Sequence, residues 1–128
     1  MEFYIGGYAQ GKLGYVLEKH RGQELEMIDG GATGRIAADT GKRIVLNHLH
    51  LLVKNLLEQG EDPEQYMRDL LEENPDCIVI SDEIGNGIVP MERQEREYRE
   101  RLGRIQIEIA AKAESVERVI CGLGQKLK

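Results

Sequence analysis

The pattern of hydrophobic positions divides the chain into short apolar runs and longer segments with helical spacing. Residues 77–81 (CIVIS) form the most strand-like run, because a continuous apolar segment of this length is typical of a strand buried on both faces. Further strands are expected at residues 2–5, 24–29, 43–47 and 116–121. Residues 122–128 (GLGQKLK) follow the last of these strands and are expected to form a tail.

Helix signals separate the predicted strands. In residues 49–57, leucine and valine recur at intervals of three and four, which places them on one face of a helix. Asp62 is expected to be an N-cap residue, since Pro63 follows at the first helical position and Gln65 lies three residues after the cap. Two more helices are expected at residues 12–19 and about 92–114.

Strands that alternate with helices predict an α/β fold. The expected architecture is one domain, residues 1–128, with a parallel sheet of about four to five strands flanked by helices. Right-handed crossovers place every strand-to-helix loop at one edge of this sheet, where ligands bind in open α/β folds. Three polar loops meet at that edge: residues 6–12, Asn47-His48 and Asp82-Glu83.

Composition and charge exclude several classes of protein. The chain has 128 residues, 41% hydrophobic and 31% charged, which suits one folded domain with a core. A net charge of −6 and the lack of a basic cluster argue against a nucleic-acid partner. No membrane partner is expected either, because no apolar run approaches the length of a bilayer span; we expect a cytoplasmic protein. Cys77 and Cys121 lie in apolar runs and are expected to be buried free thiols.

The segment GGYAQGKL, residues 6–13, lies between the first predicted strand and the first predicted helix. It matches the phosphate-binding pattern GxxxxGK, in which successive amides face phosphate oxygens and the lysine reaches the outer phosphates. An accidental match occurs roughly one time in ten in a glycine-rich chain. Leu13 replaces the usual serine or threonine that coordinates magnesium, and Tyr8 is bulky enough to crowd a phosphate. A nucleotide site, a nucleotide site without its metal anchor, and a structural glycine turn all stay open.

A second motif carries a family resemblance. Residues 78–90 (IVISDEIGNGIVP), with the long helix and last strand after them, resemble the bifunctional adenosylcobinamide kinase/adenosylcobinamide-phosphate guanylyltransferase family, which shows S-N-E-V-G-x-G-I-V-P there. Residues 46–57 (LNHLHLLVKNLL) are similar to the family's V-D-C-L-T-L-W-L-S-N-L-L. The glycine loop is similar to its G-G-A-R-S-G-K-S. The resemblance covers about three quarters of the chain.

The resemblance implies a P-loop-type α/β fold, GTP or ATP as cofactor, and phosphorylation and guanylylation of a corrinoid intermediate in cobalamin synthesis. The family's phosphate-binding positions correspond to Gly6, Gly7, Gly11 and Lys12, with Lys12 also a candidate catalytic residue. Its second signature corresponds to Glu83, Gly85, Gly87 and Pro90; Glu83 is the second candidate catalytic residue, and Gly85 and Gly87 are candidate cofactor-binding residues. Because family members assemble through subunit contacts, the resemblance also implies a homo-oligomer.

The sequence departs from this family at positions that concern chemistry. Leu13 replaces the loop serine, and Asn47 replaces an aspartate that anchors magnesium, so metal binding is expected to be weakened. The family's segment with the guanylylated histidine is mostly absent, and no motif around His20 supports that role. His48 and His50 are expected to be solvated or capping residues. Asp82 stands where the family has asparagine; it is either a relocated metal ligand or only a cap or solvated acid.

Three functions follow as alternatives. The first is a nucleotide-binding enzyme of the family with weakened kinase chemistry, because metal charge neutralisation is central to phosphoryl transfer. The second is a catalytically silent relative that binds a nucleotide or corrinoid as a sensor or partner subunit. The third has no ligand: the glycine loop is a structural turn and the long helix an oligomer interface.

Overall fold

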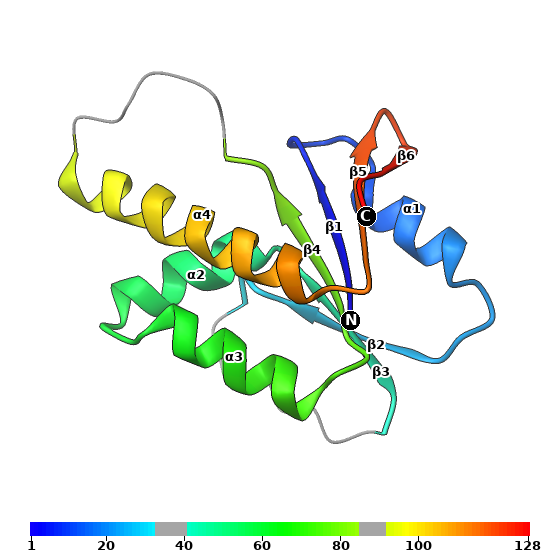
Figure 1. Cartoon of the computed structure of the whole chain (residues 1–128), viewed down its shortest axis with the longest axis horizontal. Coiled ribbons are helices and arrows are strands. Elements are labelled where there is room, and N and C mark those ends of the chain that lie inside the picture. The colour runs from blue at the N-terminus through cyan, green and yellow to red at the C-terminus, as the bar shows by residue number, and fades with distance from the viewer. Residues whose placement is uncertain (33–40, 85–91) are drawn as a thin grey trace.

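A computed structural model describes residues 1–32, 41–84 and 92–128 of the chain. One six-stranded sheet has the order β2-β3-β4-β1-β5-β6 (Figure 1). The strands are β1 (Glu2–Gly6), β2 (Leu25–Asp29), β3 (Arg43–Asn47), β4 (Ile78–Asp82), β5 (Ser115–Ile120) and β6 (Leu123–Lys126). The first five pair in parallel, and β6 pairs antiparallel with β5. The predicted α/β fold with a largely parallel sheet is confirmed.

Four helices cover the two faces of this sheet unequally. They are α1 (Lys12–Lys19), α2 (Leu49–Glu58), α3 (Pro63–Glu73) and α4 (Arg93–Lys112). Figure 1 shows α1 on one face and the other three helices on the opposite face. The larger core cluster accordingly packs under α2, α3 and α4, and a smaller cluster around Tyr4 and Val16 packs under α1. None of the helices in the described part of the chain is long and apolar enough to span a membrane.

The start of α3 confirms the predicted cap. Asp62 Oδ1 accepts hydrogen bonds from the backbone amides of Glu64 and Gln65, at 3.1 and 3.3 Å, and Pro63 is the first helical residue. The side chain of Gln65 bonds to Asp69 instead of returning to the cap. The cap therefore depends on the Asp62 carboxylate.

The predicted C-terminal tail is wrong, because residues 123–126 form β6. Cys121 and Gly122 make a two-residue turn with φ values of 52° and 73°, the positive pair that favours a tight hairpin. All four residues of β6 are exposed. An edge strand without a buried side leaves no hydrophobic pattern, which explains why the sequence did not reveal it.

The two cysteines differ in environment. Both are free thiols; Cys77 is buried, and burial raises the pKa of its thiol to about 12. Cys121 is exposed in the hairpin turn, so its predicted burial is wrong. The apolar residues before it belong to β5, which ends at Ile120, so Cys121 already lies in the turn that leads into β6.

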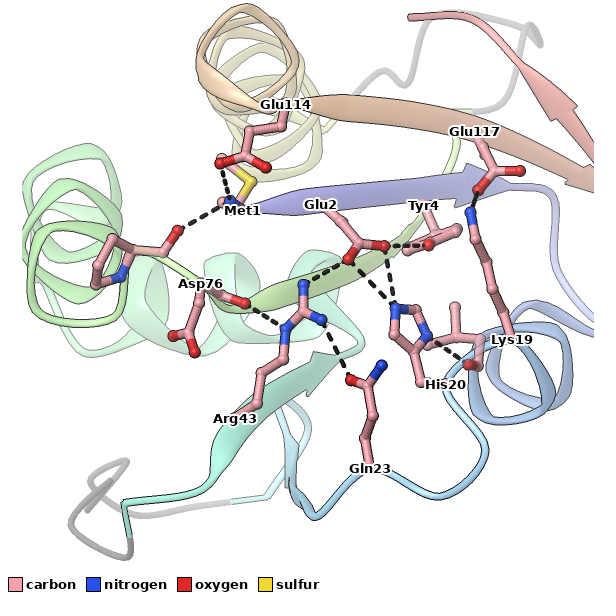
Figure 2. Close-up of polar contacts among 12 residues, drawn as sticks. Met1, Glu2, Tyr4, Lys19, His20, Gln23, Arg43, Asp76, Glu114 and Glu117 are labelled. Atoms are coloured by element: carbon pink, nitrogen blue, oxygen red, sulfur yellow. Dashed lines mark hydrogen bonds and ion pairs between the residues drawn. The ribbon is translucent and has the colours of Figure 1, made fainter.

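A polar network holds the opposite, amino-terminal end of the sheet. Figure 2 shows the side chains of Tyr4, His20 and Arg43 converging on the Glu2 carboxylate. His20 is buried, with Nε2 3.1 Å from Glu2 Oε1 and Nδ1 2.7 Å from the Val16 carbonyl oxygen. The structure thus places His20 in a structural network at the end of the sheet away from the glycine loop.

The same contacts change the acidity of Glu2. Burial by itself raises the pKa of this carboxyl, but hydrogen bonds from Tyr4, Arg43 and His20 outweigh burial and bring it from 4.5 to about 2. A carboxyl with a lowered folded pKa stabilises the protein above its unfolded pKa, and this stability is lost as the pH falls toward the folded value.

We expect Glu2→Gln to lower the free energy of unfolding near pH 7 by on the order of 3 kcal/mol, because the neutral amide loses the ionic hydrogen bonds. The difference from the native protein should shrink near pH 3, because Glu2 is protonated in the unfolded chain at that pH and folding then has to remove this proton. Urea denaturation of both proteins at the two pH values measures it. An equal loss at both would contradict this assignment.

Candidate functional site

The glycine loop lies at the carboxyl edge of the sheet, between Gly6 at the end of β1 and Lys12 at the start of α1. Gly11 is the N-cap of α1 and has φ +81°, a left-handed conformation that glycine adopts without strain. A Cβ atom on Gly6 would lie 2.4 Å from the carbonyl oxygen of Val119. Glycine is therefore required at both positions for structural reasons.

The backbone at the start of α1 offers hydrogen-bond donors. Among the described residues, no backbone carbonyl accepts a hydrogen bond from the amides of Gly11, Lys12 or Leu13. The first amides of a helix lack partners within the helix and carry its partial positive charge. This arrangement has the chemistry of an anion site.

The side chain of Lys12 folds over the loop toward β4. It is 8% exposed, with Nζ 2.7 Å from the Gly7 carbonyl oxygen and 2.6 Å from Asp82 Oδ1. A buried ammonium group needs such partners, because burial without an opposite charge is costly. The structure thus brings Gly6, Gly7, Gly11, Lys12 and Asp82 together, as the sequence predicted for that edge.

His50 is the second partner of Asp82. The Asp82 backbone amide donates to His50 Nδ1 at 3.1 Å, and His50 Nε2 lies 3.3 Å from Asp82 Oδ2. An amide only donates, so Nδ1 carries no proton and the neutral ring carries its proton on Nε2. Burial lowers the pKa of His50, although the Asp82 charge opposes this, and a neutral ring is favoured. The prediction of a solvated or capping His50 is wrong.

A second acid–histidine pair lies beside the first. His48 is the N-cap residue of α2, but its Nδ1 lies 2.9 Å from Asp29 Oδ1 at the end of β2, and its side chain makes no cap bond. The hydrogen bond with His48 lowers the pKa of Asp29. The rings of His48 and His50 are 5.5 Å apart in an edge-on arrangement. Acidic and basic side chains therefore line the carboxyl edge of the sheet, from Asp29 at the end of β2 to Lys12.

Gln106 fixes the end of β4 from the long helix. Its buried Nε2 donates to Ser81 Oγ at 3.0 Å and to the Asp82 carbonyl oxygen at 2.9 Å. Sequence reasoning missed Gln106, Asp29 and the role of His50. The available signal was that Gln106 is a polar residue on the apolar stripe of α4, and this signal does not identify the residues that it contacts.

The Glu83 carboxylate is not among the contacts that the structure gives for Lys12. Its carboxylate pairs with Arg118 of β5, with Nε 2.5 Å from Oε1 and Nη2 3.1 Å from Oε2. Its backbone amide donates to the Gly6 carbonyl oxygen at 2.8 Å, which ties β4 to the start of the loop. The candidate residues Gly85 and Gly87, like Pro90, lie outside the described residues.

The donor atoms at this edge do not fit a magnesium ion held mainly by the protein. Leu13 packs against the apolar cluster under α1, and Asp82 Oδ1 already contacts Lys12. In the described part of the chain, no three His, Cys, Asp or Glu side chains are grouped so as to hold a metal ion.

A pocket of about 300 Å³ opens beside Asp82. Its lining consists of residues from α2 and the end of β4 and of residues from α4: His50, Asp82, Glu83, Ile84, Glu95, Tyr98, Arg99 and Leu102. The Tyr98 hydroxyl donates to the His50 carbonyl oxygen at 3.0 Å, which links α4 to the start of α2. The carboxylate partner of Lys12 thus also faces a cavity large enough for part of a second ligand.

Most of this chain matches a known protein family, and several known proteins are similar to it. Residues 18–127 match the family described as cobinamide kinase / cobinamide phosphate guanyltransferase, a match that begins after the glycine loop. A bifunctional adenosylcobalamin biosynthesis protein of Salmonella typhimurium is 32% identical over an alignment 120 residues long, gaps included, which covers 79% of this chain and 65% of that protein. Its Pseudomonas aeruginosa counterpart is 29% identical over an alignment 132 residues long, gaps included, which covers 92% of this chain and 76% of that protein.

The Escherichia coli protein with the same description is 39% identical over 51 residues, covering 40% of this chain and 28% of its own length. The chain thus spans less than two thirds of the Salmonella and Escherichia proteins. Because the family match extends over most of the chain, this protein belongs to the cobinamide kinase / cobinamide phosphate guanyltransferase family.

Proposed function

We propose that this chain binds a nucleoside triphosphate, GTP or ATP, at the glycine loop and acts in cobinamide phosphorylation or guanylylation with weakened kinase chemistry. The observation that carries the proposal is the position of Lys12. Its buried ammonium group lies against the glycine loop. In the described part of the chain, no backbone carbonyl accepts a hydrogen bond from the amides of Gly11, Lys12 or Leu13. Family membership supports a cobinamide as the second substrate.

The shape of the loop supports binding in preference to a purely structural turn. Tyr8, the residue expected to crowd a phosphate, is 86% exposed, so its ring does not fill the loop. A helix N-terminus and a lysine bind phosphate without help from a metal. Binding is therefore expected to survive the replacements at Leu13 and Asn47 better than catalysis does.

Lys12 has to change partners when phosphate binds. Its Nζ is bound to Asp82 and to the Gly7 carbonyl oxygen, and a triphosphate would compete with the Asp82 carboxylate for it. Once released, that carboxylate faces the pocket beside Tyr98 and is placed to accept a proton from a substrate hydroxyl there. The neutral His50 ring and Gln106 hold the end of β4 in place during the exchange.

Two residues favour a second candidate function, that of a catalytically silent relative. Leu13 and Asn47 remove the usual oxygen ligands for magnesium, and each loss of about 1.4 kcal/mol in transition-state stabilisation slows a reaction tenfold. Such a relative would bind a nucleotide or corrinoid as a sensor or partner subunit. A homo-oligomer and a cytoplasmic location stay predictions from the sequence.

We expect calorimetric titration with GTP and ATP, each with and without magnesium, to detect binding that Lys12→Met weakens at least about tenfold through loss of the charge. Lys54→Met, on the exposed side of α2, is the matched control. A turnover assay with cobinamide then separates the two functions: binding without turnover favours the silent relative. Absence of binding for both nucleotides would contradict the proposal.

Asp82→Asn tests what this carboxylate does. If Asp82 only competes for Lys12, the variant should bind nucleotide several-fold more tightly without magnesium, because phosphate then meets no rival charge. If Asp82 has taken over metal binding, the variant should lose the magnesium dependence of affinity. An unchanged magnesium dependence excludes the relocated metal ligand. Asp29→Asn, which makes the same charge change beside His48, is the control.

A further inference from the structure

We propose that the hairpin turn between β5 and β6 braces the glycine loop through Gln10, which makes Gln10 a positioning residue for nucleotide binding. The inference rests on the proposed function, since it concerns the same loop. It assigns a role to a C-terminal segment that sequence analysis treated as a tail.

Both carbonyl oxygens of Gln10, that of the side chain and that of the backbone, accept hydrogen bonds from this turn. The Cys121 backbone amide donates to Gln10 Oε1 at 2.8 Å, and the Gly122 backbone amide donates to the Gln10 carbonyl oxygen at 2.8 Å. Gln10 lies in the second half of the loop, directly before Gly11 and two residues before Lys12. The turn is thus bound to the segment whose amides are proposed to face phosphate.

Two close backbone approaches surround these hydrogen bonds. A Cβ atom on Gly11 would lie 3.4 Å from Gly122 Cα, and one on Gly6 would lie 2.4 Å from the Val119 carbonyl oxygen. The loop therefore follows β5 and its turn closely: a side chain at Gly6 has no room, and a Cβ atom at Gly11 would already touch the turn. On its other side, Lys12 ties the loop to β4 through Asp82.

The conformation of the turn, which the two-residue hairpin requires, is one that the contact to Gln10 helps to hold. Cys121 has φ +52°, a left-handed conformation that costs energy for a residue other than glycine. Such a conformation persists where surrounding contacts determine it, and the hydrogen bond to Gln10 is one of them.

The hairpin is anchored in the domain through β5, whose Val116 and Val119 are buried, whereas β6 is exposed. Glu117 of β5 accepts a hydrogen bond from the Tyr15 hydroxyl at 2.7 Å and pairs with Lys19, both on α1. The side chains of β6 are exposed, so little apolar surface depends on its position. Loss of the Gln10 contact should therefore affect the loop more than the stability of the domain.

The physical effect is preorganisation. A loop held in its binding conformation loses less conformational entropy when the phosphate binds, and affinity rises accordingly. Gln10 contributes through its acceptor oxygen and does not need to touch the nucleotide.

The test is Gln10→Met, which keeps side-chain length and removes the acceptor, with Gln125→Met on exposed β6 as the matched control. Nucleotide Kd is measured by calorimetry, and amide hydrogen exchange at Cys121 is measured without nucleotide. We expect Gln10→Met to raise Kd roughly tenfold, to speed exchange at Cys121, and to leave the thermal midpoint close to that of the native protein. Gln125→Met should change none of these.

The outcomes separate the two proposals. If the native protein binds and Gln10→Met binds equally well, the brace is overturned and the proposed function stands. If Cys121 exchanges equally fast in the native protein and the variant, the contact is not formed in solution and the brace is again overturned. If the native protein binds neither GTP nor ATP, the proposed function fails first.

Discussion

The ion pair between Lys12 and Asp82 is the interaction on which the candidate site depends. Burial of an ammonium group is tolerated only with an opposite charge close by, and the carboxylate lies 2.6 Å away. This requirement fixes the start of α1 relative to the end of β4, two elements that are far apart in the sequence. His50 and Gln106 in turn hold Asp82, so α2 and α4 are tied to the same point.

Much of the fold could be predicted from the sequence, and the site only in part. Strands such as β4 are buried on both faces and reveal themselves by continuous apolar runs, whereas β6 is exposed and has no such signal. The glycine loop is a local motif, so it was found. The partners His50 and Gln106 lie 32 and 24 residues from Asp82, and no local pattern reports a contact at that separation.

Leu13 has a structural use in the fold, at the position where the phosphate-loop pattern usually has serine or threonine. Its side chain packs against the small cluster under α1 that contains Tyr4 and Val16. That face of the sheet is covered by one short helix, so each apolar contact there forms a large share of its packing (Figure 1). A serine or threonine at this position would bury less apolar surface against the cluster. The packing of α1 would then be weaker.

The contrast between the two thiols has a practical consequence. Cys77 is buried with a pKa of about 12, so it is unreactive near neutral pH, whereas Cys121 is exposed in the turn that contacts Gln10. A maleimide dye or spin label added to the unaltered chain would therefore attach at one position. The protein carries its own attachment point for an optical or magnetic reporter within a few bonds of the loop.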